Sequence, residues 1–241
     1  MFLQEVIVSD IRDEPGFSDR RTEALRRLDE LTGAKGGDPE DRRSWFEQVY
    51  ELADDDPAAV PWADLKPKDV LVAWLARNPG AGRRALDVAC GLGDNAEALS
   101  AAGWATTAFD LADGAIQWAR RRFPDTKVDY QVADLFNPPQ EWIGAFDLVH
   151  ECYTLQALHG DLRERGFAAI ANLVAPGGTL LVITRSGEDG VGYDGPPWPL
   201  TPSELDRFRD LGFALRSHRA YDVHRPDGRV IEHVMAEFRK K

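Results

Sequence analysis

Arg84-Ala-Leu-Asp-Val-Ala-Cys-Gly-Leu-Gly-Asp94 is the stretch that decides the fold of this 241-residue chain. It begins as a short apolar run, which is typical of a strand buried on both faces. It then breaks at Gly91 and Gly93, and the residues after Asp94 show helical spacing of apolar side chains. Glycines let a backbone approach a ligand closely, and the first turn of a helix offers free N–H groups. The stretch therefore predicts a nucleotide-binding turn between a strand and a helix.

Two carboxylates near this turn indicate which nucleotide it binds. Gly91 to Ala96 fits the dinucleotide pattern G-x-G-x-x-G/A, so NAD is one candidate. Asp110, which ends the next apolar run, suits the ribose of either cofactor. Asp87 would face the pyrophosphate of NAD, whereas it could meet the cationic amino-acid tail of S-adenosylmethionine. We therefore expect S-adenosylmethionine.

The glycine turn and its two acids resemble motif I and the following acid of class I S-adenosylmethionine-dependent methyltransferases. Ala89 stands where many members have their first glycine, and Pro176-Gly-Gly178 before an apolar run is a further marker. The resemblance covers residues 45–238. It implies an α/β, Rossmann-like fold whose seven-stranded sheet is mostly parallel, with an antiparallel last strand.

Three segments resemble the thiol, thiopurine and halide methyltransferases within that class. They are a helix with Trp45 followed by an acidic segment and Pro61-Trp62, the run 151–158, and Gly195-Pro-Pro-Trp198. The resemblance implies that Trp45 and Trp62 pack over the cofactor, and that the last segment helps to wall a substrate pocket. It favours methyl transfer to a small thiol. The alternative is an O- or N-methyltransferase of a small aromatic metabolite.

The remaining candidate site residues follow the ends of the expected strands, which meet at one edge of a parallel sheet. His150, at the end of the fourth strand, is a candidate for assisting deprotonation, although a histidine there can equally orient or pack. Glu151 is longer than the aspartate usual in the resembling group, and we expect it to reach toward the substrate. Tyr153 is a further catalytic candidate. The predicted cofactor contacts are Trp45, Trp62, Asp87, Ala89, Gly91, Gly93, Asp110, Leu111, Asp134, Leu135 and Glu151, and the predicted substrate contacts are His159, Tyr193 and Trp198.

Composition limits the partners. The formal net charge of −12 argues against nucleic acid as substrate, and we expect the acidic chain to repel anionic acceptors. No apolar run approaches the roughly 20 residues that span a bilayer, so no membrane partner is expected. Cys90 and Cys152 show no metal-ligand spacing, which predicts no metal and favours the reducing cytoplasm. A small-molecule acceptor is expected, with the protein a monomer or a homodimer.

The chain divides into an N-terminal extension and a methyltransferase domain, residues 1–40 and 41–241. Arg20 to Leu31 predicts an amphipathic helix with Leu25, Leu28 and Leu31 on one face. This extension is either a lid over the site or a packing appendage. Two other functions stay open from sequence, a nicotinamide-dependent oxidoreductase and a non-catalytic protein that keeps the cofactor site.

Overall fold

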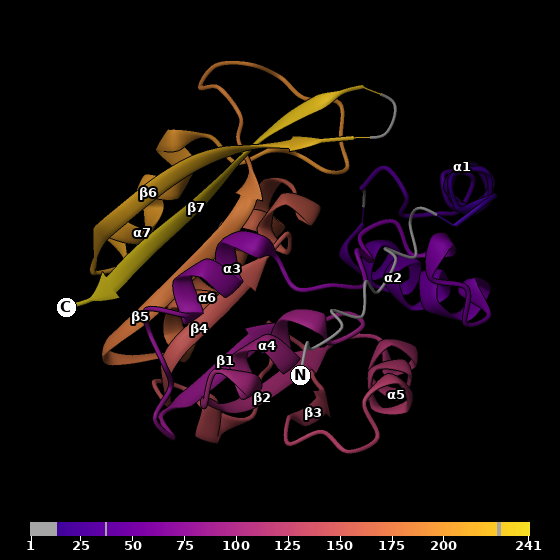
Figure 1. Ribbon diagram of the computed structural model, residues 1–241. Helices are drawn as coiled ribbons and strands as arrows, with labels where there is room; N and C mark the ends of the chain where they lie inside the picture. Colours follow the sequence, from indigo (N-terminus) through magenta and orange to yellow (C-terminus); the bar gives the residue numbers. More distant parts are fainter. Residues whose placement is uncertain (1–13, 37, 226–227) are drawn as a thin grey trace.

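The computed structural model describes residues 14–36, 38–225 and 228–241, and its centre is one twisted sheet (Figure 1). Apolar runs between glycine and proline turns form its strands. These strands are β1 (Arg84–Val88), β2 (Ala105–Asp110), β3 (Asp129–Val132), β4 (Phe146–Cys152), β5 (Val174–Arg185), β6 (Phe213–His224) and β7 (Val230–Lys240).

The strand order is β3-β2-β1-β4-β5-β7-β6. The first five strands pair in parallel, whereas β7 runs antiparallel to both β5 and β6. The predicted Rossmann-like fold, with seven strands and an antiparallel last one, is confirmed. Because β1 and β4 are neighbours, the carboxyl ends of these two central strands lie side by side, where α/β sheets bind their ligands.

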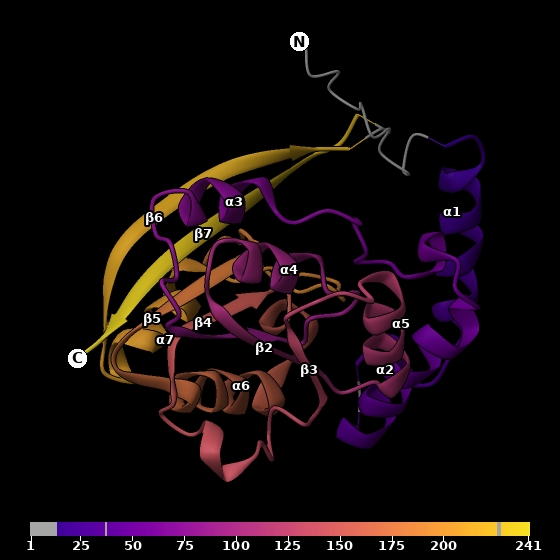
Figure 2. The same cartoon turned by 60° about the horizontal axis from the view of Figure 1, so that its bottom comes forward.

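Helices cover both faces of the sheet (Figures 1 and 2). Helices α3, α4 and α5 pack on one face, and α6 and α7 on the other. We call these the α4 face and the α6 face. The helices are α1 (Phe17–Leu28), α2 (Pro39–Ala53), α3 (Asp69–Leu75), α4 (Asp94–Ala101), α5 (Asp113–Arg122), α6 (Gly160–Leu173) and α7 (Pro202–Asp210), with 3-10 turns η2 (Pro57–Ala59), η3 (Gln140–Trp142) and η4 (Leu155–Ala157).

The described residues from Phe17 to Trp62, which we call the leader, contain helices α1 and α2 and turn η2, and α2 packs beside α5 (Figure 2). Arg21 of α1 donates hydrogen bonds to the carbonyls of Pro57, Ala58, Val60 and Ala63. The predicted apolar stripe of this helix is partly wrong, because Leu28 is buried but Leu25 is 41% exposed. The helix packs through Phe17 and Leu28, so its buried face begins earlier in the chain than predicted.

Within the described residues, no helix is long and apolar enough to cross a membrane.

Candidate active site

The glycine turn after β1 is fixed by Asp110 at the end of β2. The Gly91 N–H donates to Asp110 Oδ2 at 2.9 Å, and the Ala112 N–H donates to Oδ1 at 3.0 Å. Burial raises the pKa of Asp110 to about 6, although these N–H groups oppose the shift. A carboxylate can accept more hydrogen bonds than these, so the predicted role toward ribose hydroxyls is chemically possible and stays a prediction.

Gly91, Gly93 and Ala89 of the turn are small for different structural reasons. A Cβ on Gly93 would lie 2.3 Å from Tyr130 Oη, so this glycine is required by packing inside the protein. A Cβ on Gly91 would lie 3.4 Å from Tyr50 Oη, beneath the leader. Ala89 has a φ of 50°, a left-handed conformation that explains why glycine is usual at this position.

The leader places aromatic rings over the turn. Trp62 Nε1 donates to Tyr50 Oη at 2.9 Å, and both side chains lie next to Gly91. Trp45 lies farther out: its Nε1 donates to the Leu28 carbonyl at 3.1 Å, and its ring centroid is 5.9 Å from that of Trp62. Tyr50, which was not predicted from the sequence, therefore lies with Trp62 at the turn. Trp45 packs against the Trp62 ring.

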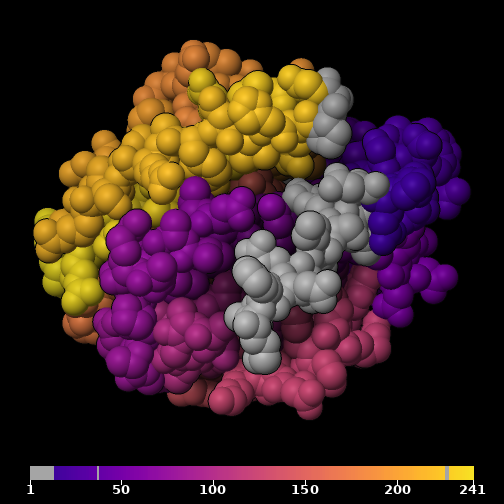
Figure 3. All heavy atoms as spheres, in the orientation of Figure 1, coloured from indigo at the N-terminus to yellow at the C-terminus, as the bar shows by residue number. Residues whose placement is uncertain are grey.

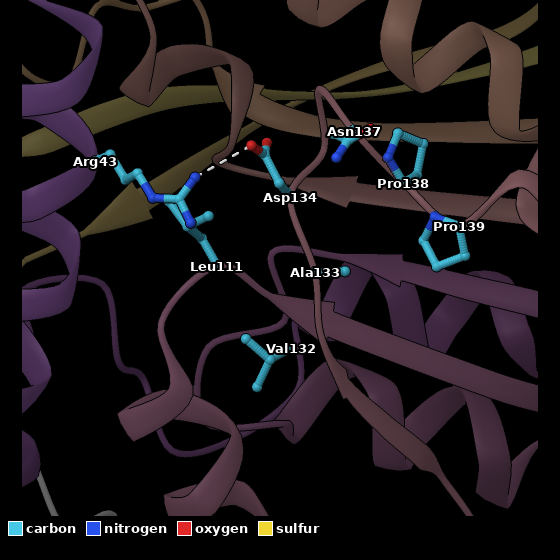
Figure 4. A pocket seen from close by; sticks show the side chains of 8 residues that line it. All are labelled: Arg43, Leu111, Val132, Ala133, Asp134, Asn137, Pro138 and Pro139. Atoms are coloured by element: carbon cyan, nitrogen blue, oxygen red, sulfur yellow. Dashed lines mark hydrogen bonds and ion pairs between the residues drawn. The ribbon is translucent and has the colours of Figure 1, made fainter.

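A cavity of about 500 Å³ opens beside the ends of β2 and β3 (Figure 4). Asp134 accepts from the Phe136 N–H at 2.8 Å and pairs with Arg43 of α2 at 3.2 Å. The predicted cofactor contacts Leu111 and Asp134 both line it. The Leu135 side chain is packed in the core of the α6 face, so the predicted contact of this residue with the cofactor would be made by its backbone and stays a prediction. The lining residues are Arg43, Leu111, Val132, Ala133, Asp134, Asn137, Pro138 and Pro139.

Asp87 and His150 form a buried pair at the centre of the edge. They are register partners on β1 and β4, and His150 Nδ1 lies 2.6 Å from Asp87 Oδ1. A neutral imidazole that donates from Nδ1 carries its lone pair on Nε2. Within the described residues, His150 Nε2 and Asp87 Oδ2 are both buried and have no hydrogen-bond partner. Buried polar atoms are rarely left unpaired, so the two atoms indicate a ligand-binding position.

Glu151 is held by its own loop. Its Oε1 accepts from the N–H groups of Thr154 and Leu155, at 2.6 and 3.0 Å, at the start of η4. Burial raises its pKa to about 7. The amides of the turn use only Oε1, and within the described residues Oε2 is buried without a hydrogen-bond partner, so the expectation that this side chain reaches toward the substrate stays a prediction. Its role toward the cofactor stays a prediction.

Tyr153 is part of a polar group that sequence reasoning missed. Its Oη lies 2.9 Å from His233 Nε2, and Nδ1 of that histidine donates to the Ile231 carbonyl, so the tyrosine donates to Nε2. Lys68 Nζ lies 4.1 Å from the centroid of the tyrosine ring. Burial and nearby cations lower the pKa of His233 to about 4, so it is neutral at pH 7. No local motif marks His233, because the pairing of β5 with β7 brings it to the site.

Of the three predicted substrate contacts, His159 and Trp198 pack together, and Tyr193 is held within its own loop. The rings of His159 and Trp198 are 4.9 Å apart, and the Trp198 N–H donates to the Gln156 carbonyl at 2.8 Å. Tyr193 accepts a hydrogen bond from the Glu188 N–H, within its own loop. Their contact with a substrate stays a prediction.

Comparison with known proteins gives a consistent result. Residues 85–178 match the family model described as a methyltransferase domain. The chain is 32% identical over 150 residues to the ubiquinone biosynthesis O-methyltransferase of Aromatoleum aromaticum, a match covering 61% of this chain and 62% of the relative. It thus spans less than two thirds of that relative's length.

Two solved structures share the fold. One is the Burkholderia thailandensis 1,6-didemethyltoxoflavin-N1-methyltransferase with bound S-adenosylhomocysteine, with a TM-score of 0.63, 20% identity and coverage of 85% of this chain and 91% of that one. The other was solved for the conversion of a disulfide bond into a thioacetal group during echinomycin biosynthesis, with a TM-score of 0.66, 21% identity and coverage of 83% and 93%. The strand order and the matched family model agree: residues 85–178, which hold the glycine turn and its acids, are similar to a methyltransferase domain, and the sheet has the Rossmann-like methyltransferase fold.

Proposed function

We propose that this chain transfers the methyl group of S-adenosylmethionine to a hydroxyl oxygen of a small aromatic acceptor. The observation that carries the proposal is the buried Asp87–His150 pair, whose Nε2 atom has no partner among the described residues. An imidazole fixed by a carboxylate at one nitrogen and free at the other is suited to accept a proton.

Three features of the described residues support the proposed cofactor. Asp87 Oδ2, buried and unpartnered, suits the ammonium of the amino-acid tail. Asp110 suits the ribose, and the cavity at Asp134 suits the adenine. When bound, the cofactor supplies an electrophilic methyl group on a sulfonium, which is already a good leaving group.

The acidity of the acceptor makes a base useful. A phenol of pKa about 10 is mostly protonated at pH 7, whereas a thiol of about 8.5 needs less help. We assign proton acceptance to His150 Nε2, with Asp87 orienting the ring and stabilising the imidazolium. Trp62, next to Gly91, is positioned to cover the turn at which the cofactor would bind. The relationship to a ubiquinone O-methyltransferase also supports an oxygen acceptor.

A thiol acceptor is the second candidate. The leader and the Gly195–Trp198 segment resemble the corresponding segments of thiol methyltransferases. The Trp198 ring packs against His159, and the two rings could form one side of a substrate pocket. An NAD-dependent reaction is less favoured, because Asp87 would face the pyrophosphate. The proposed setting is the cytoplasm, with a small molecule as the partner and a monomer or homodimer as the assembly.

The test is a competition panel of hydroxyl, thiol and amine analogues on the same aromatic ring, scored by kcat/KM with methyl-labelled cofactor. We expect the hydroxyl analogues to be methylated fastest, with the label on oxygen. A thiol analogue that outruns its hydroxyl partner would support the second candidate and overturn this one. Tight binding of NAD without any methyl transfer would overturn both.

A further inference from the structure

Three strands bring side chains to one place on the α4 face, beyond Tyr153. Arg185 at the end of β5 is the register partner of His233 on β7, and His233 is the partner of Tyr221 on β6. Directly paired residues project to the same face of a sheet. The rings of Tyr221 and His233 are 5.5 Å apart, which agrees with this placement. The Arg185 side chain therefore lies beside the Tyr153–His233 hydrogen bond.

The turn between β6 and β7 adds positive charge to the same face. Side chains alternate along a strand, so Arg225 continues the row of Tyr221 on β6. The Arg225 N–H donates to the Arg229 carbonyl at 2.8 Å, and Arg229 continues the row of His233 on β7. The pKa of Arg185 is lowered, mainly by burial and to a smaller extent by the positive charges of Arg225 and Arg229. In Figure 3 the yellow surface of β6 and β7 lies directly above the violet surface that includes α3.

Among the described residues, no carboxylate pairs with the Arg185 guanidinium. Within the same residues, the hydrogen bonds of Arg185 are made by its backbone, whose N–H donates to Gln156 Oε1 at 2.8 Å. The nearby carboxylate of Asp64 is in contact with Lys68. Asp222 and Glu232 are one residue out of phase with Tyr221 and His233, so they project to the opposite face. A partly buried cation facing other cations and no carboxylate is a position suited to an anion.

We propose that Arg185, supported by Arg225, binds a carboxylate on the acceptor, so that the substrate is an aromatic hydroxy acid. This inference rests on the proposed O-methyl transfer and adds the substrate class to it. It also reverses the expectation that the acidic chain repels anionic acceptors. For a bound carboxylate, attraction to a cation in the site is stronger than repulsion by distant acidic residues on the surface.

The spacing of the site limits the shape of such an acceptor. His150 is the register partner of Leu181 on β5, and Arg185 lies four residues farther along that strand. At about 3.3 Å per residue, the backbone positions of Leu181 and Arg185 are roughly 13 Å apart, and the long arginine side chain can span part of that distance. The hydroxyl and the carboxylate should therefore be at separate positions of a ring rather than on adjacent carbons.

The experiment measures binding without turnover. 3-Hydroxybenzoate and its neutral match, 3-hydroxybenzamide, are titrated by calorimetry into the full chain saturated with S-adenosylhomocysteine. Arg185→Gln should weaken benzoate binding roughly ten- to a hundred-fold, the value of one charge-assisted hydrogen bond, and leave benzamide binding unchanged. Arg185→Lys should lose less, and Arg216→Gln, an exposed arginine elsewhere on β6, should bind both like wild type.

The outcomes separate the two proposals. Equal benzoate affinity in wild type and Arg185→Gln, or a wild type that prefers the benzamide, overturns the carboxylate subsite. Methylation of the carboxylate rather than the hydroxyl of 3-hydroxybenzoate also overturns it, because the carboxylate would then lie at the reacting position. Arg185-dependent benzoate binding without transfer to any hydroxyl supports the subsite and overturns the proposed O-methyl transfer alone.

Discussion

His150 and Asp87 are joined across the ends of β4 and β1, with Nδ1 and Oδ1 2.6 Å apart, and each partner retains one buried atom without a hydrogen bond among the described residues. The two free atoms differ in chemistry. Asp87 Oδ2 is a carboxylate oxygen, which suits a cation. His150 Nε2 is an imidazole nitrogen, whose lone pair can accept a proton. In the proposed function the first binds the cofactor and the second serves the acceptor.

Replacing the acid at the end of β2 should weaken cofactor binding. Asp110→Ala removes the carboxylate that orders the Gly91 turn and, in the proposed function, accepts the ribose hydroxyls, so S-adenosylhomocysteine should bind roughly ten- to a hundred-fold more weakly. Calorimetry at pH 8, above the pKa of about 6, keeps the wild-type carboxylate ionised. Asp125→Ala, at an exposed position, is the control. Unchanged affinity in a folded Asp110→Ala protein contradicts the ribose assignment.

Glu151 should make stability depend on pH. Its folded-state pKa, about 7, lies above the ordinary value of 4.5, so the folded protein holds this proton more tightly than the unfolded chain. The free energy of unfolding should therefore fall as pH rises from about 4.5 through 7, by about 3 kcal/mol for this group.

Glu151→Gln keeps an oxygen for the amides of Thr154 and Leu155 but cannot ionise. Urea unfolding at pH 5 and pH 8 should show a smaller difference for this variant than for wild type. Glu141→Gln, at an exposed position, should behave like wild type. Identical pH dependence in all three proteins would show that the buried carboxyl group is not the source.

The leader should stabilise the domain as well as cover it. Arg21→Gln leaves backbone carbonyls such as those of Pro57 and Ala63 without their shared donor, which should cost about 1–3 kcal/mol of unfolding free energy. Arg27→Gln, exposed on the same helix, is the matched control. Urea unfolding gives the stability, and kcat in the same samples tests the lid. Lower kcat with unchanged stability indicates a lid alone, and no change in either contradicts both roles.

Tyr153→Phe tests the polar group beside the acceptor. It removes one donor to His233 and keeps the ring that Lys68 contacts, so we expect a loss of about 1 kcal/mol, or roughly fivefold in kcat/KM. Cofactor affinity should not change. A loss confined to cofactor binding would contradict the assignment of Tyr153 to the acceptor side.

The sequence was most informative where the chemistry is local. The glycine turn with Asp87 and Asp110, and the alternation of strands and helices, were sufficient to predict the fold. The limits lie in contacts between distant segments. The register of β1 with β4 pairs Asp87 with His150, the antiparallel pairing of β5 with β7 brings His233 to Tyr153, and the folding of the leader brings Tyr50 to Gly91.

The direction of a side chain was also beyond the sequence. Glu151 stands at the predicted strand end, but the amides of Thr154 and Leu155 compete for its carboxyl group and hold it in the loop. Leu135 follows Asp134, which lines the cavity beside β2 and β3, but the apolar Leu135 side chain is buried in the core of the α6 face.

The most direct test of His150 as the proton acceptor is a series of phenols of graded acidity. Single-turnover rates are measured for wild type and His150→Gln, both saturated with S-adenosylmethionine. A general base contributes roughly a hundred- to ten-thousand-fold, so the variant should lose about that much with weakly acidic phenols. The loss should shrink steadily with acidity and nearly vanish for a nitrophenol that is already ionised. An equal loss across the whole series, or no loss at all, would contradict the account.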